Sequence, residues 1–172
     1  MAPQALQAQQ LQQFLTASHI RHALPSSPNY ASLRQQYILD TPATPLAIAR
    51  PQSAEDVSLI VSHAVASGIA VTVRSGGHDL YGRCFSDDAL AIDMRDIAFV
   101  EVDADEKCAR IGGGILAGEL AERLAERKLA AAFGSVPSVG YVGWATHGGA
   151  FFPACFQLHG TFCISRKADH VS

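Results

Sequence analysis

The sequence predicts an α+β fold, with a parallel β-α-β unit first and mostly antiparallel strands after it. Two short apolar runs, 46–50 and 69–73, flank one well-capped helical pattern. Three more strand-like runs, 89–94, 98–103 and 108–114, follow with short links. The chain has 172 residues, of which 48% are hydrophobic and only 17% are charged. That length and composition suit one globular domain and exclude a disordered chain.

The first 45 residues predict a helix followed by a connector. Six glutamines lie within 4–13, and apolar residues then recur at roughly helical spacing, so we expect an amphipathic helix. Residues 25–45 contain four prolines and predict a connector with little regular secondary structure. We therefore divide the chain into residues 1–45 and a domain over residues 46–172.

The β-α-β unit begins with the strand at 46–50. A capping box follows, in which Ser53 supplies the N-cap hydroxyl and Asp56 the acid at the third helical position. Gly68 then ends the helix, and the second strand occupies 69–73. Both strands are apolar throughout, as buried parallel strands are, so we expect parallel pairing and a right-handed crossover.

The second half of the chain predicts one more helix and then a glycine-rich segment. Leucines recur at helical spacing over 116–128, and Glu119 and Arg123 stand four residues apart, as in a favourable ion pair. The glycines within 130–150 are too dense for a regular strand or helix.

Charge and composition exclude several classes of function. Lys and Arg number 13 against 16 Asp and Glu, and the net charge of −3 leaves no basic excess for nucleic-acid binding. No apolar run reaches the roughly 18–20 residues of a membrane-spanning helix. The N-terminus lacks the basic and apolar regions of a signal peptide, which favours a cytoplasmic location. The four cysteines form no C-x-x-C pair, so we expect neither a zinc ribbon nor a disulfide framework.

The first candidate site is a loop at the carboxyl end of the strand at 69–73, where ligands of parallel α/β units bind. It consists of Arg74, Ser75, Gly76, Gly77, His78 and Asp79. Its glycines let the backbone approach a ligand, and successive N–H groups can hold an anion such as a pyrophosphate. His78 is the loop's only side chain able to attach covalently to an electrophile near pH 7. The alternative is a glycine turn with an exposed histidine.

A second glycine-rich stretch, Gly112 to Ala117, fits the dinucleotide pattern G-x-G-x-x-G/A. A nicotinamide site needs an acid about 20 residues further on, where residues 131–134 are Ala, Ala, Phe and Gly. It also needs parallel strands, whereas we expect the preceding strands to be antiparallel. We therefore interpret 112–117 as a close-packed turn.

The third stretch is interpreted as backbone laid against a large ligand. Ser138 and Thr146 can donate hydrogen bonds there, and the interspersed apolar residues argue against a flexible linker. The residues concerned are Pro137, Ser138, Val139, Gly140, Gly143, Thr146, Gly148 and Gly149.

Other sites find less support in the sequence. Cys155, His159 and Cys163 share a helical spacing, but no fourth ligand is evident, so we expect no metal site. A Ser–His hydrolytic pair is disfavoured because no G-x-S-x-G elbow exists. We name no catalytic residue, and His147 and Tyr141 are only weak candidates for a substrate base.

Four motifs occur together: R-S-G-G-H-D at 74–79, A-I-D-M-R at 91–95, G-G-G-I-L-A-G-E-L at 112–120 and P-S-V-G at 137–140. With the β-α-β unit, they resemble the FAD-linked oxidases of the vanillyl-alcohol oxidase type, in particular the berberine-bridge-enzyme-like branch. The resemblance covers about residues 46–149. It implies a PCMH-type FAD-binding domain, in which two α+β subdomains hold FAD between them.

The resemblance also implies roles for the first and third stretches. Backbone amides of the loop at 75–79 would hold the FAD pyrophosphate, His78 would bond to the 8α-methyl carbon of the flavin, and residues 137–149 would line it. Many members of the branch add a second bond, from a cysteine just before the P-[ST]-V-G motif. Val136 stands there, so we expect attachment by the histidine alone.

The implied activity is hydride transfer from a small-molecule C–H bond next to O or N to flavin N5, with reoxidation by O2. Residues 150–163 depart from the family pattern, and family members continue well beyond the length of this chain. We therefore expect a truncated or mis-spliced member that lacks the substrate domain. The alternative is a non-catalytic remnant that binds FAD weakly or not at all.

Overall fold

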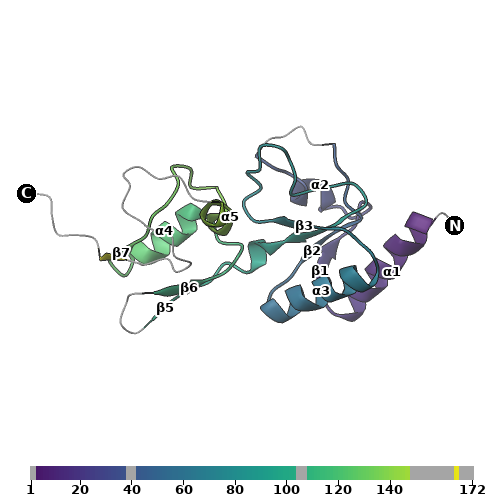
Figure 1. The fold of residues 1–172 in the computed structure, drawn as a ribbon, viewed down its shortest axis with the longest axis horizontal. Coiled ribbons are helices and arrows are strands. Elements are labelled where there is room, and N and C mark those ends of the chain that lie inside the picture. Colours follow the sequence, from purple (N-terminus) through teal and green to yellow (C-terminus); the bar gives the residue numbers. More distant parts are fainter. Residues whose placement is uncertain (1–2, 38–41, 104–107, 148–164, 167–172) are drawn as a thin grey trace, which may run out of the picture.

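In the computed structural model the protein has two lobes, joined by the short 3-10 helix η1 (Met94–Asp96) (Figure 1). The structure describes residues 3–37, 42–103, 108–147 and 165–166. We call the part before η1 the N-terminal lobe and the part after it the C-terminal lobe. Within the described ranges, no helix is long and apolar enough to cross a bilayer.

A four-stranded sheet forms the centre of the N-terminal lobe, in the order β1-β2-β4-β3. Its strands are β1 (Arg21–Ala23), β2 (Ala47–Arg50), β3 (Val71–Arg74) and β4 (Leu90–Asp93). β2 and β3 each pair in parallel with β4, and β1 pairs antiparallel with β2.

The position of β4 corrects two expectations. The strands of the β-α-β unit are parallel, as predicted, but they do not pair with each other because β4 lies between them. The antiparallel pairing expected for 89–94 is also wrong, since β4 is the central parallel strand. All four residues of β4 are buried, and an element that is covered on both faces belongs in the middle of a sheet.

β3 lies at an edge of the sheet and is only partly covered. The side chains of Val71 and Val73 are 36% and 59% exposed, so burial throughout, which the apolar sequence indicated, does not hold for this strand. β2 has the same apolar pattern and is buried at three of its four positions. An apolar run therefore predicted a strand correctly but not its place in the sheet.

Two helices, α1 (Pro3–Ala17) and α3 (Ala54–Ala66), pack into one core with the strands. That core includes Leu11, Leu15, Ile60, Leu90 and Ile92. The predicted cap is confirmed, because the Ser53 hydroxyl accepts a hydrogen bond from the N–H of Asp56 at 3.1 Å. Gly68 follows the helix with a φ of +64°, as predicted for a helix stop.

The connector contributes to a second core of the same lobe. Helix α2 (Tyr30–Leu33) of the connector carries Tyr30, whose hydroxyl donates to the carbonyl of Pro45 at 2.7 Å. Tyr30 packs in one cluster with Ile48, Cys84 and Phe85. The segment before residue 46 is thus built into the N-terminal lobe.

The C-terminal lobe is built on two-stranded sheets in place of a four-stranded one. Its elements are β5 (Val100–Val102), β6 (Ala109–Ile111), α4 (Ala117–Ala125), β7 (Leu129–Ala130), α5 (Tyr141–Thr146) and β8 (Ser165–Arg166). β5 and β6 pair antiparallel, as predicted, and β7 pairs antiparallel with β8. The core between α4 and α5 includes Leu120, Leu124 and Tyr141.

The glycine-rich turn before α4 is close-packed, which confirms the interpretation of 112–117. A Cβ on Gly112 would collide with the backbone of Ile97, and a Cβ on Gly114 with the backbone of Met94. The start of α4 is fixed by Glu119, which accepts from the N–H of Leu116 at 3.0 Å and pairs with Arg95 of η1 at 2.6 Å. Arg95 thus takes the place of the predicted partner Arg123, which adds only a minor electrostatic effect.

Candidate functional site

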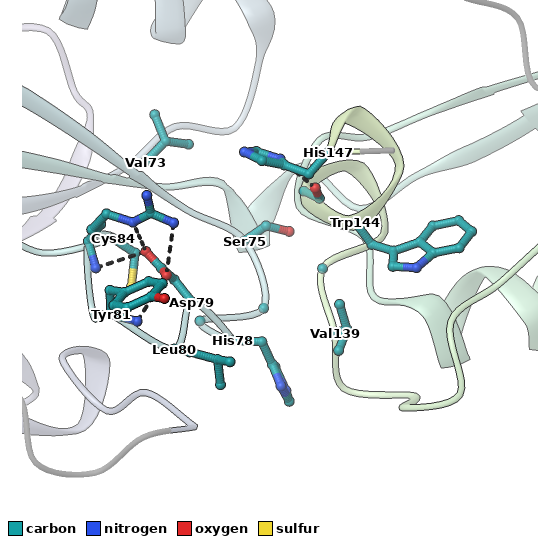
Figure 2. A pocket seen from close by; sticks show the side chains of 15 residues that line it. Val73, Ser75, His78, Asp79, Leu80, Tyr81, Cys84, Val139, Trp144 and His147 are labelled. Atoms are coloured by element: carbon teal, nitrogen blue, oxygen red, sulfur yellow. Dashed lines mark hydrogen bonds and ion pairs between the residues drawn. The ribbon is translucent and has the colours of Figure 1, made fainter. Parts of the chain in front are cut away.

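A cavity of about 740 Å³ lies between the two lobes (Figure 2), within the range of roughly 300–1,000 Å³ that is usual for cofactor and small-molecule sites. The segment after β3 forms one wall, and α5 with the residues before it forms the other. The lining residues are Val73, Ser75, Gly76, Gly77, His78, Asp79, Leu80, Tyr81, Arg83, Cys84, Val139, Gly140, Gly143, Trp144 and His147.

The two walls meet backbone to backbone. A Cβ on Gly76 would lie 2.6 Å from the carbonyl oxygen of Ser138, and a Cβ on Gly140 would lie 2.6 Å from the backbone nitrogen of Gly76. Gly77 has a φ of +69°, which glycine adopts without strain. The glycines of both motifs therefore let the lobes approach each other, a role that the sequence did not indicate.

Ser75 lines the cavity, and its hydroxyl oxygen is buried at this junction. Within the part of the chain that the structure describes, its hydroxyl has no hydrogen-bond partner. The backbone N–H groups of Gly76, Gly77 and His78 likewise donate to no acceptor among the described residues. Buried polar groups in folded proteins nearly always have partners, so this cluster of donors is suited to a ligand.

The imidazole of His78 is held from two sides. Its ring stacks on Tyr37, with ring centroids 4.3 Å apart and an interplanar angle of 19°. Its Nε2 atom lies 2.9 Å from Oγ of Ser138, on the other lobe. Burial lowers the pKa of His78 below its ordinary value, which favours the neutral and nucleophilic ring at pH 7.

Asp79 closes the turn that follows His78 (Figure 2). Its carboxylate accepts from the N–H groups of Tyr81 and Arg83 and pairs with the Arg83 guanidinium at 2.9 Å. The hydrogen bond from Arg83 holds the pKa of Asp79 below its ordinary value. The acid is therefore ionised at neutral pH and its charge is compensated within the turn.

Arg74 lies under the loop and is absent from the cavity lining. Its Nη1 donates to the buried carboxylate of Asp93 at 3.0 Å, and its Nη2 donates to the carbonyl of Gln35 at 3.2 Å. Arg74 thus ties together β3, β4 and the connector, and supports the loop from behind.

Three described residues of the third stretch also lie outside the lining: Pro137, Ser138, whose hydroxyl contacts His78, and Thr146. Pro137 is next to Gly118 of α4, whose N–H donates to the Pro137 carbonyl at 2.9 Å. Thr146 donates from Oγ1 to the carbonyl of Val142 at 2.9 Å, within its own helix. Outside the described residues lie Gly148, Gly149, the atypical segment 150–163, Cys155, His159 and Cys163.

The two weak candidates for a base differ in position. Tyr141 is 1% exposed in the core of the C-terminal lobe, and burial raises its pKa, so its hydroxyl stays protonated. His147 lines the cavity, with Nδ1 2.8 Å from the carbonyl oxygen of Gly143.

Sequence reasoning missed several residues around the cavity: Tyr37, Leu80, Tyr81, Cys84 and Trp144. Leu80 and Tyr81 directly follow the loop motif, a position that could have identified them. The Cys84 thiol donates to Oε1 of Gln36 at 2.7 Å, and burial raises its pKa, which makes it an unreactive wall residue. Tyr37 carries no sequence signal, because it lies in the connector outside any motif.

The comparisons with known proteins agree with this geometry. The FAD binding domain family matches residues 45–160, which is more than half of the chain. (R)-6-Hydroxynicotine oxidase of Paenarthrobacter nicotinovorans is 40% identical over 108 residues, which cover 63% of this chain and 24% of that enzyme. The chain therefore spans about a quarter of the length of that relative.

Solved structures match both lobes. BBE-like 1 of Physcomitrella patens gives a TM-score of 0.74 at 28% identity, covering 78% of this chain and 30% of that one. Glucooligosaccharide oxidase of Acremonium strictum, described with 6-S-cysteinyl, 8α-N1-histidyl FAD, gives 0.73 at 27% identity, covering 78% and 29%. The predicted α+β fold and the predicted resemblance are confirmed. The chain belongs to the FAD binding domain family, with the PCMH-type fold that berberine-bridge-enzyme-like oxidoreductases share.

Proposed function

We propose that this chain binds FAD in the cavity between its lobes, bonded to His78, and serves as the FAD-binding part of an oxidoreductase. The observation that carries the proposal is the group of unpartnered donors beside His78. The hydroxyl of Ser75 and the N–H groups of Gly76, Gly77 and His78 belong to consecutive residues, have no acceptor among the described residues, and lie where two backbones meet. Such a concave group of donors is suited to an anion, and FAD supplies one in its pyrophosphate.

The residues present fit this cofactor in three respects. The cavity of about 740 Å³ has an apolar residue on each wall, Leu80 after β3 and Val139 before α5, which suits a flat ring system. The charge of Asp79 is neutralised by Arg83, so it does not repel a phosphate. His78, neutral because burial lowers its pKa, is the nucleophile nearest to the donors.

The bond to His78 balances as follows. The His78 imidazole would lose its proton and form a carbon–nitrogen bond to the 8α-methyl carbon of the flavin, which would also lose a proton. Dioxygen would take up the two electrons released and the two protons, and become hydrogen peroxide. Val136 stands where relatives carry a cysteine and is 41% exposed, so we propose no second bond.

FAD bound here would accept a hydride from a C–H bond next to O or N in a small-molecule substrate. The residues of this chain would hold and orient it: the loop after β3 would bind the pyrophosphate, and apolar residues on both walls would exclude water from the ring system. The relatives are named as oxidases, which supports a small-molecule substrate and dioxygen as the electron acceptor.

The test is to produce the full chain with FAD, precipitate it in acid, and measure flavin absorbance in the pellet and the supernatant. Wild type should carry flavin in the pellet, and His78→Ala should carry it only in the supernatant. His63→Ala is the matched control, because His63 lies on α3 and stacks on Phe14 of α1 instead of touching the cavity. Flavin in neither fraction of the wild type would overturn the proposal and favour a non-binding remnant.

A further inference from the structure

The short segment 35–37, part of the connector, is fastened to the loop that carries His78. The carbonyl of Gln35 accepts from Arg74 at 3.2 Å, and Oε1 of Gln36 accepts from Cys84 at 2.7 Å. The N–H of Tyr37 donates to the carbonyl of Gly77 at 3.0 Å, directly before His78. Three successive residues thus hold the loop, and the third places its ring against the imidazole.

The stack and the hydrogen bond constrain His78 in complementary ways. Stacking on Tyr37 fixes the plane of the imidazole, and the contact of Nε2 with Ser138 fixes its rotation within that plane. Neutral imidazole has one N–H and one lone pair. When Nε2 carries the proton and donates it to Ser138, the lone pair is on Nδ1, which has no hydrogen-bond partner among the described residues.

We propose that Tyr37 and Ser138 are positioning residues for flavin attachment, which orient His78 so that Nδ1 is the nitrogen that forms the bond. The inference rests on the proposed function, since it concerns the same histidine and the same carbon–nitrogen bond. It gives the connector a role in flavin attachment. The family motifs of this chain all lie after residue 73 and do not include Tyr37.

Because Tyr37 is exposed, substitution of its ring can test the orientation of His78 without a loss of protein stability. Tyr37 is 62% exposed, so its ring contributes little to the core and its removal leaves both hydrophobic clusters of the N-terminal lobe intact. Its backbone hydrogen bond to Gly77 is independent of the side chain. Substitution of the ring therefore removes the stack and keeps the segment in place.

The first experiment follows covalent incorporation of FAD into the full chain over time, by intact mass and acid-stable flavin fluorescence. Tyr37→Ala and Ser138→Ala should each slow it about 10- to 100-fold, the range expected for a misoriented reacting group. Tyr37→Phe keeps the ring and should restore the rate to within about 3-fold of wild type. Gln35→Ala keeps the backbone carbonyl that Arg74 uses and should react as wild type does.

The second experiment needs no flavin, and its main result comes from the wild type. Long-range ¹⁵N–¹H correlation spectra of the FAD-free wild type report which nitrogen of His78 is protonated. We expect one dominant tautomer with the proton on Nε2, and mixed tautomers in Tyr37→Ala. A wild-type ring protonated on Nδ1, or wild-type incorporation rates in both Tyr37→Ala and Ser138→Ala, would overturn the inference. A wild type that never binds flavin would instead refute the proposed function.

Discussion

The two lobes use the same kind of contact, an arginine paired with a carboxylate, in different settings. In the N-terminal lobe Arg74 meets Asp93 at 3.0 Å, with side-chain exposures of 16% and 1%, under a sheet of four strands. Between η1 and the C-terminal lobe, Arg95 meets Glu119 at 2.6 Å, with exposures of 23% and 38%, beside two-stranded ladders. The difference indicates that the loop bearing His78 is supported by the more deeply buried of the two ion pairs.

Asp93→Ala should cause the largest loss in the free energy of unfolding among the three substitutions. It leaves the guanidinium of Arg74 without its buried counter-charge, and breaking a buried pair costs about 3–5 kcal/mol. Urea unfolding measures the loss. Glu101→Ala is the control, because the pair of Glu101 with Arg110 is exposed and should contribute less than about 1 kcal/mol. Equal losses in both variants would contradict the assigned difference in burial.

Gly76→Ala should cause the second-largest loss of stability. The added Cβ meets backbone of Ser138 and Gly140, which cannot rotate away, so we expect a loss of about 3 kcal/mol in the free energy of unfolding. Gly143→Ala is the matched control, at a glycine that lines the opposite wall of the same cavity. Nothing lies within 4 Å of its added Cβ, and the position is helical, so it should gain up to about 1 kcal/mol. If Gly76→Ala were as stable as wild type, the lobes would not be in backbone contact at this point.

Glu119→Gln should have the smallest effect and a distinct pH dependence. The pair is partly exposed, so we expect a loss of about 0.5–1 kcal/mol at pH 7. Arg95 holds the pKa of Glu119 below its ordinary value of 4.5, so the stabilisation is complete above that value and is lost as the pH falls through the lowered pKa. Chemical unfolding of wild type and variant from pH 7 to pH 3 should show the difference shrinking. A difference that grows in acid would contradict the assigned pair.

Local patterns predicted many elements of the fold, but not α5, because the dense glycines of 130–150 were interpreted as excluding a helix. The cap at Ser53 and the stop at Gly68 are set by neighbouring residues, and the hairpin of β5 and β6 by a short link. Strand order was not predictable in the same way, because β2, β3 and β4 are all short apolar runs and nothing local states which one is central. Only the loss of cover over Val71 and Val73 marks β3 as an edge.

The candidate site shows the same limit. Its motifs were visible as glycines and a histidine in sequence, but the partner of Arg74 lies 19 residues away and the partner of His78 lies 60 residues away. The stack of Tyr37 on His78 joins an irregular connector to a loop, and neither has a periodicity that could predict the contact.

The central position of β4 constrains the order in which the chain can fold during its synthesis. β2 and β3 leave the ribosome first, yet the strand that both must pair with is made after them. Until then each carries an unpaired edge, which is open to association with other chains. A nascent chain released from the ribosome only as far as residue 88 holds two strands without their shared partner. Once Leu90–Asp93 has emerged, the sheet can form completely, and the His78 loop gains the sheet that supports it.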